Sequence, residues 1–352
     1  MLKNKNDNNY VFITNPNLIY EELLFKEEGE NLIKINNFID IYYPKNIKNE
    51  VYLILPRIKT YYIDIIRILD NKKIISLKGH NNLILEVRHF YNPKDKYDYL
   101  LSVDEIYKIC VWDLTNNFKI KYFIEVEYIF NISDCLLIFD ENNKEDYILI
   151  STSGIKNDNY SKLFSFENKG EFIKNIPSTN LNKTYNLIRW NYIKENNDIY
   201  IIECCNKYIY IYNLNNLEIN FKLAPFLHES INCSGCIIKK NDVDYLFTIA
   251  YNGYINIFDL NKKLYITNIY CEYNNNFCCI IQWNINYIII SIKGKMQTID
   301  IYQKIIVNSI KVNNNDIIYY KKIIHPYYGE SLLSIESDSS IKLWVIKNNL
   351  IK

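Results

Sequence analysis

A unit of short apolar runs recurs along this chain at a nearly constant spacing, and this recurrence constrains the fold more than any other feature. Its clearest copy runs from Gly79 to Asp113; it opens on Gly79-His80 and ends on an apolar run that contains Trp112. Positions matching Trp112 occur in six further units, at intervals of 43 or 46 residues and one of 54: Leu69, Phe166, Tyr212, Phe258, Ile301 and Trp344. Repeats of this length are typical of propellers and arrays of small units.

Each unit is built from short strand-like runs separated by Asn, Asp, Gly and Lys turns. Apolar runs of this length between turn residues predict β-strands, and no long helical pattern interrupts them after residue 31. The first strands are expected at 38–43, 83–90, 134–139, 185–190, 231–238, 277–282 and 317–324. The long interval coincides with a polar insertion at 154–159, which we expect between the second and third strands of the third unit. The fold class predicted is therefore all-β.

The Gly79-His80 and Trp112-Asp113 pairs, which bracket three short strands, resemble a WD repeat. In that family each repeat forms one four-stranded blade. The resemblance implies a seven-bladed β-propeller built from WD-type repeats. The residues that carry the signature are Gly79, His80, Ser102, Trp112, Asp113, Thr248, Phe258, Asp259, Ser334, Asp338 and Trp344.

WD repeats often hold a hydrogen-bonded set of His, Ser or Thr, Asp and Trp that ties the loops of a blade to its strands. The resemblance implies that His80, Ser102 and Trp112 belong to such a set. Because Ile106 occupies the position six residues before Trp112, we expect the set to lack its Asp. We expect these residues to be structural, since a buried indole N–H or hydroxyl needs a partner.

The resemblance also implies that an N-terminal strand closes the ring. The two candidate strands are 31–35 (NLIKI), which we favour, and 10–14 (YVFIT). Residues 1–30 then form an extension, partly disordered or packed on the propeller, and residues 31–352 form the propeller. Within the extension, the apolar spacing of 18–28 predicts an amphipathic helix with Asn17 as its N-cap.

Composition narrows the classes of partner. The chain has 41 basic and 40 acidic residues, a net charge of +1, which offers no electrostatic footprint for nucleic acid or an anionic membrane. The N-terminus lacks the apolar core of a signal peptide, and no run approaches the roughly 20 apolar residues of a membrane span. We therefore expect a cytoplasmic or nuclear protein whose nine cysteines stay reduced.

The residues of catalytic and metal sites occur here without the spacing that such sites need. Cys233 and Cys236 match C-x-x-C, but residues three apart on a strand point to opposite faces unless a bulge at Gly235 intervenes. The four histidines are scattered, and the common hydrolase, metalloprotease, P-loop and kinase motifs are missing. We expect no enzyme activity, no metal and no cofactor.

The sequence therefore favours a non-catalytic protein–protein interaction scaffold within a multiprotein complex. Two alternatives stay open: a small-molecule binder or enzyme that uses the central channel, and a reader of modified peptides.

The expected contact face is the side of the ring that carries Gly79-His80, because turns between second and third strands lie on that side. The candidate contact residues are Asp104, Glu105, Cys205, Asn206, Tyr251, Asn252, Lys293 and Ser337. Tyr251 is the preferred anchor, since aromatic residues are enriched at binding hot spots.

Overall fold

The structure is a computed structural model of the 352-residue chain. It describes residues 18–26, 39–44, 47, 49–106, 108–126, 132–139, 145–152, 160–177, 189–195, 198–205, 208–214, 219–223, 232–250, 252–271, 279–292, 294–312, 317–337 and 340–346.

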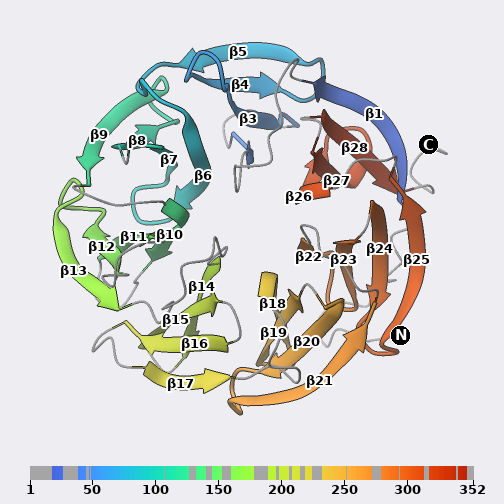
Figure 1. The fold of residues 1–352 in the computed structure, drawn as a ribbon. Coiled ribbons are helices and arrows are strands. Elements are labelled where there is room, and N and C mark those ends of the chain that lie inside the picture. Colours follow the sequence, from blue (N-terminus) through green and yellow to red (C-terminus); the bar gives the residue numbers. More distant parts are fainter. Residues whose placement is uncertain are drawn as a thin grey trace, which may run out of the picture.

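The described strands form a β-propeller: seven antiparallel four-stranded sheets lie around a central axis (Figure 1). In ring order, from the inner to the outer strand, the first sheet is β2 (Asp40–Tyr42), β3 (Tyr52–Pro56), β4 (Ile63–Arg67) and β5 (Lys72–Leu77), and the second is β6 (Ile84–Asn92), β7 (Tyr97–Asp104), β8 (Lys108–Asp113) and β9 (Lys119–Glu125). The third is β10 (Ile132–Phe139), β11 (Asp146–Thr152), β12 (Tyr160–Ser165) and β13 (Phe172–Pro177), and the fourth is β14 (Arg189–Glu195), β15 (Asp198–Cys205), β16 (Tyr208–Asn213) and β17 (Ile219–Leu223). The fifth is β18 (Asn232–Lys240), β19 (Val243–Ala250), β20 (Tyr254–Asp259) and β21 (Leu264–Tyr270), and the sixth is β22 (Ile280–Gln282), β23 (Tyr287–Ile292), β24 (Lys295–Asp300) and β25 (Ile305–Lys311). The seventh is β26 (Ile317–His325), β27 (Gly329–Glu336), β28 (Ser340–Ile346) and β1 (Leu18–Lys26).

The segment expected to be an N-terminal helix is strand β1. It pairs antiparallel with β28, with Leu18 opposite Ile346 and Lys26 opposite Ser340. The helix prediction for 18–28 was wrong because two register shifts interrupt the strand, and they break the period-two pattern that identifies a strand in sequence. Both candidate closing strands, 10–14 and 31–35, lie outside the described residues. The position beside β28 belongs to β1, so the sheets include residues that the sequence assigned to the extension.

The pairing between the third and fourth strands of a sheet contains a register shift that recurs from sheet to sheet. It falls immediately before Trp112 in the second sheet and before Tyr212 and Phe258 in the fourth and fifth. The same shift identifies the equivalents of Trp112 in the first, third and sixth sheets as Ile66, Phe164 and Ile299.

The matches proposed from sequence for these three sheets, Leu69, Phe166 and Ile301, were wrong by two or three residues. Each follows its strand closely, in or just before the turn. The main-chain N–H of Phe166, for example, donates to Asp146 O at 2.8 Å, at the start of a neighbouring strand. Apolar residues on both sides of a strand end made the two registers hard to separate in the sequence.

The expected first strands agree with the observed inner strands except at the start of the fourth and sixth sheets. β14 begins at Arg189 rather than at 185, and 185–188 lie outside the described residues. β22 begins at Ile280 rather than at 277, and 277–278 lie outside them as well. The polar insertion at 154–159 also lies outside them, in the interval between β11 and β12.

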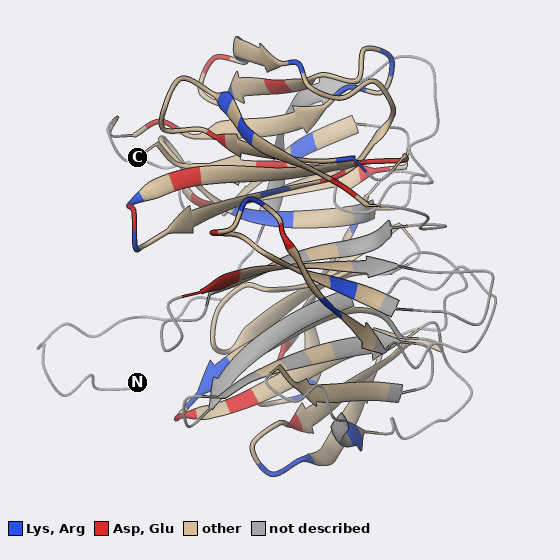
Figure 2. Ribbon diagram, turned by 90° about the vertical axis from the view of Figure 1, so that its left-hand side faces the viewer, with Lys and Arg blue, Asp and Glu red and all other residues tan. Residues whose placement is uncertain are grey.

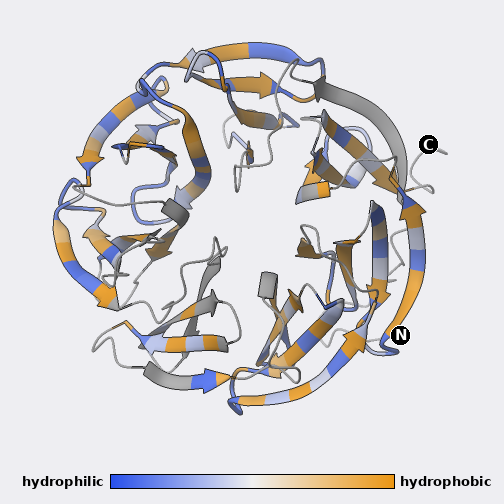
Figure 3. Cartoon of the chain, viewed as in Figure 1, coloured by the Kyte–Doolittle hydropathy of each residue, from blue (hydrophilic) through white to orange (hydrophobic). Residues whose placement is uncertain are grey.

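The hydrophobic core is divided among the seams between sheets. Each buried cluster of the described residues joins two neighbouring sheets, and one of them joins the first sheet to the seventh. Figure 3 shows apolar residues along the strands and polar ones at the turns. Acidic and basic residues are interspersed over the side seen in Figure 2. The sheets are therefore held mainly by apolar packing, which a mixed surface encloses.

Asp40 forms a polar contact among three inner strands of the ring. Its carboxylate pairs with Lys321 Nζ of β26 at 2.5 Å and accepts the main-chain N–H of His89 in β6 at 2.7 Å. Burial alone would raise the pKa of Asp40, but the charge and hydrogen bond of Lys321 outweigh burial and lower that pKa below its ordinary value. The ionised carboxylate thus joins the first sheet to both neighbours.

We predict that acid weakens the protein through Asp40. A carboxyl group with a depressed folded-state pKa stabilises the fold above its unfolded pKa of about 3.9, and this contribution is lost as pH falls through the folded value. In urea titrations, the free energy of unfolding should fall more steeply below about pH 4 for the wild type than for Asp40→Asn. The control is Asp70→Asn, which removes an exposed carboxylate paired with Arg67 and should change this profile much less. Equal profiles for wild type and Asp40→Asn would contradict this role.

We also predict that β1 is required for stability. Deleting residues 1–29 removes β1 and exposes the edge of β28, whereas deleting residues 1–17 leaves β1 in place. The longer deletion should aggregate or lose several kcal/mol of unfolding free energy, at about 1 kcal/mol per hydrogen bond lost. Thermal melts and light scattering would compare the two, and equal behaviour would show that the β1–β28 pairing is dispensable.

Candidate functional site

Four polar side chains form a continuous hydrogen-bonded chain in the second sheet. Trp112 Nε1 donates to Ser102 Oγ at 2.8 Å, and Ser102 Oγ lies 2.7 Å from His80 Nε2. His80 Nδ1 lies 2.9 Å from Asp104 Oδ2. The consistent direction is that the serine hydroxyl donates to His80 Nε2 and the Nδ1–H of His80 donates to Asp104. Every polar atom of the serine and imidazole is thereby used.

Local geometry brings these residues together. Ser102 and Asp104 are two apart on β7, so they point to the same face. His80 lies in the loop between β5 and β6, where Gly79 permits close approach: a Cβ added to Gly79 would lie 2.7 Å from Trp112 Cη2. Lys108 Nζ also donates to Gly79 O at 2.8 Å. Close packing against Trp112 therefore requires a glycine at the position before His80.

Asp104 supplies the acid that the sequence analysis expected to be missing. That expectation was wrong because the carboxylate comes from the end of β7, two residues before Ile106. The assignment of Asp104 to an exposed contact face was wrong as well, since it is fully buried. Its Oδ1 accepts the main-chain N–H groups of Ile106 and Lys108, at 3.2 and 3.0 Å, so it also shapes the turn after β7.

Ser102, His80 and Asp104 are hydrogen-bonded in the same sequence as the Ser, His and Asp of a serine hydrolase triad. Their burial determines whether a substrate can reach the serine hydroxyl. Ser102 and Asp104 are 0% exposed and His80 is 4% exposed. The Ser102 oxygen already accepts the indole N–H of Trp112. A substrate carbonyl has no access to this hydroxyl in the observed arrangement, so the set ties a loop to two strands.

The seventh sheet contains an altered copy of this set. Trp344 Nε1 donates to Ser334 Oγ at 2.9 Å, as Trp112 does to Ser102. Glu336 lies two residues after Ser334 and pairs with Lys342 Nζ at 2.6 Å. A buried acid–lysine pair thus stands where the second sheet has an acid–histidine pair. Asp338, expected from sequence to belong here, lies outside the described residues.

The fifth sheet keeps the positions without the hydrogen bonds. Thr248 and Phe258 are both buried, and Thr248 Oγ1 finds no hydrogen-bond partner in the described chain. Phenylalanine has no N–H to donate. Apolar packing therefore holds this sheet at the place where the second sheet is polar.

The aspartates that end third strands cap the following turn. Asp113 Oδ1 accepts the main-chain N–H of Asn116 at 2.8 Å, and Asp259 Oδ1 accepts that of Lys262 at 2.8 Å. Sequence analysis missed Asp300, whose Oδ1 accepts the N–H of Tyr302 at 2.8 Å. The available signal was an aspartate directly before a short polar turn, the usual setting of an Asx turn.

The predicted contact face is only partly described. Glu105 is exposed, whereas Asn252 and Ser337 are half-buried. The side chain of Cys205 and residues Asn206, Tyr251 and Lys293 lie outside what the structure describes, so the choice of Tyr251 as anchor stays a prediction.

Three exposed apolar side chains on this side of the ring were missed. Ile106 is 58% exposed on the turn after β7, and Tyr61 is 37% exposed on the equivalent turn of the first sheet. Phe123 is 46% exposed and lies beneath Lys108 Nζ, 4.2 Å from the ring centroid. An apolar residue inside a polar turn was the signal that could have found Ile106 and Tyr61. We call Tyr61, Ile106 and Phe123 the apolar face.

Only one cysteine side chain of the C-x-x-C segment, that of Cys236, lies within what the structure describes. The register shift of β18 falls at Cys233 rather than at Gly235, and burial raises the pKa of Cys236 to about 12. Cys236 is therefore a protonated thiol at neutral pH. Among the described residues, no group of three or more His, Cys, Asp or Glu side chains is arranged to hold a metal ion.

Comparison with known proteins adds no family or relative. No protein-family model matches the chain, and no curated protein matches it. In the described part of the chain, no helix has the length and apolar character needed to cross a membrane.

We predict that Ser102→Ala destabilises the protein by about 2 to 6 kcal/mol. The change leaves the indole N–H of Trp112 and Nε2 of His80 buried without partners, at roughly 1 to 3 kcal/mol for each such group. Urea unfolding measures this loss. Ser337→Ala removes the same hydroxyl at a half-buried turn and should stay within about 0.5 kcal/mol of wild type. A similar loss for both variants would show that the hydrogen-bonded chain has no special weight.

Proposed function

We propose that this chain is a seven-bladed WD-type propeller in which β1 closes the ring, and that it acts as a non-catalytic protein-interaction scaffold. The support is the resemblance of Gly79-His80 and Trp112-Asp113 to the WD signature, together with a complete His80–Ser102–Asp104–Trp112 set. A set of this kind, fully engaged in holding loops, favours a platform over a catalyst.

Ile106 is the observation that carries the proposed contact site. Asp104 stabilises the turn that carries this exposed side chain, because its carboxylate accepts hydrogen bonds from the main-chain N–H groups of Ile106 and Lys108. Little conformational entropy is lost when a partner packs on an anchor that is already ordered. The apolar face thus combines an aliphatic and two aromatic side chains, and aromatic anchors are common at the centre of interfaces.

The proposal predicts that Ile106→Asp abolishes capture of a protein partner without unfolding the ring. Quantitative affinity purification after mild crosslinking would measure partner recovery, and thermal melts would measure folding. We expect recovery to fall at least about tenfold, as for a hot-spot residue worth 1.4 kcal/mol or more, with a melting temperature near that of wild type.

The matched control is Ile324→Asp. Ile324 is 53% exposed at the end of inner strand β26 where the chain turns into β27, on the other side of the ring from the turn that carries Ile106. It should retain the partner. Failure of the wild type to recover any stoichiometric protein would contradict the scaffold function, and equal recovery by Ile106→Asp would contradict the contact face.

A further inference from the structure

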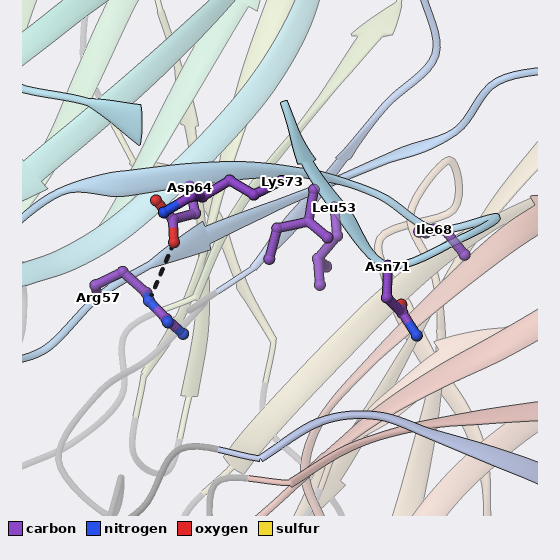
Figure 4. Close-up of a pocket in the computed structure, with 7 residues that line it drawn as sticks. Leu53, Arg57, Asp64, Ile68, Asn71 and Lys73 are labelled. Carbon is purple, nitrogen blue, oxygen red and sulfur yellow. Dashed lines mark ion pairs between the residues drawn. The ribbon is translucent and has the colours of Figure 1, made fainter. Parts of the chain in front are cut away.

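A cavity of about 220 Å³ lies against the first sheet (Figure 4). Its apolar floor comes from Leu53, Ile66 and Ile68, and its polar wall includes Arg57, Asp64 and Lys73. Most of its lining runs along β3, β4 and β5, away from Ile106 and Phe123, although Arg57 lies in the turn that also carries Tyr61.

Strand register places the cavity on one face of the first sheet. Leu53 is opposite Ile66, and Ile66 is opposite Lys73, so side chains from three adjacent strands form one row. Leu53 also belongs to the buried cluster that packs the first sheet against the seventh, and Ile66 packs against that cluster. The cavity therefore lies on the face that the first sheet turns toward the seventh.

The polar wall of the cavity has more positive than negative side chains. Asp64 is buried and receives Arg57 Nε at 3.2 Å and Ser76 Oγ at 2.5 Å. One carboxylate thus stands against two cations, Arg57 and Lys73. Lys73 is exposed and forms no ion pair with any described residue. The described lining residues therefore carry a net positive charge over an apolar floor, which complements an apolar group beside an anion.

The volume of the cavity favours a peptide side chain over a cofactor-sized ligand. Sites for small molecules and cofactors usually enclose about 300 to 1,000 Å³, which exceeds this cavity. A single large apolar side chain fits such a space, and anchors of this kind dominate binding energy at protein interfaces.

We propose that this cavity is an anchor pocket for a partner-protein segment in which a large apolar residue adjoins an aspartate or glutamate. The apolar side chain packs on Leu53, Ile66 and Ile68, and the carboxylate faces Lys73 and Arg57. The pocket deepens the proposed scaffold function, on which it rests, by naming the chemistry of a second contact.

The pocket is tested by direct binding to the purified full-length chain. The probes are fluorescein-labelled octapeptides with a central Leu or Phe flanked by Glu, and a matched set in which Lys replaces Glu. Fluorescence anisotropy should show saturable binding of the Glu set and at least about fivefold weaker binding of the Lys set. Lys73→Glu should weaken the Glu set by a similar factor and narrow or reverse the preference.

Lys72→Glu is the matched control, because Lys72 is also exposed but neighbours Lys73 on the strand and so points to the opposite face. It should bind the Glu set like wild type. Absence of saturable binding to the wild type, equal binding of both sets, or equal effects of Lys72→Glu and Lys73→Glu would each overturn the pocket.

Two further variants separate the pocket from the contact face. Ile66→Phe reduces the cavity and should weaken the Glu set, provided that its melting temperature shows a folded ring. Ile106→Asp should bind the peptides like wild type. A protein partner whose capture depends on Ile106 while no peptide binds would overturn the pocket and leave the scaffold function standing.

Discussion

A ladder of hydrogen bonds holds the seventh sheet together at the one place inside a described sheet where neighbouring strands come from opposite ends of the described chain. Within the other six sheets, the strands follow one another in sequence. In the seventh, β28 and β1 belong to opposite ends of the described chain and are held side by side by pairing. Because every sheet packs on two neighbours, a gap here would leave an open strand edge and loosen the seams on either side. Apolar packing and the contact of Asp40 with Lys321 support the adjacent seam between the seventh and first sheets.

Much of this architecture could be predicted because sheet repeats leave a strong imprint on sequence. The spacing of apolar runs located nearly all inner strands, and Tyr212 and Phe258 were matched correctly to Trp112. The error at β1 has its physical origin in β-bulges. A bulge adds a residue to one strand only, so it shifts the alternation on which pattern reading relies. The two bulges of β1 made a strand resemble a helix.

Side-chain surroundings could be predicted less well than strands. Asp104 was placed on the surface because it precedes a polar turn, but its side chain folds inward to His80. Asp300 was overlooked although it caps its turn as Asp113 does. The exposure of Ile106 and the net charge beside Lys73 depend on which side chains come into contact across neighbouring strands and sheets. The sequence pattern of polar and apolar residues does not specify those contacts. The buried polar set and the exposed apolar face are nevertheless linked, since Asp104 bonds to His80 on one side and fixes the turn of Ile106 on the other.

The pairing of Leu18 with Ile346 also brings the two ends of the described chain together. The two ends of the described chain lie next to each other on adjacent antiparallel strands, the arrangement that a hairpin turn joins within the other sheets. A short linker there would make the seventh sheet as continuous as the rest, and the polypeptide could then start and stop at a different turn around the ring. The described sheets are thus arranged cyclically, and the first and last described strands meet inside the seventh sheet.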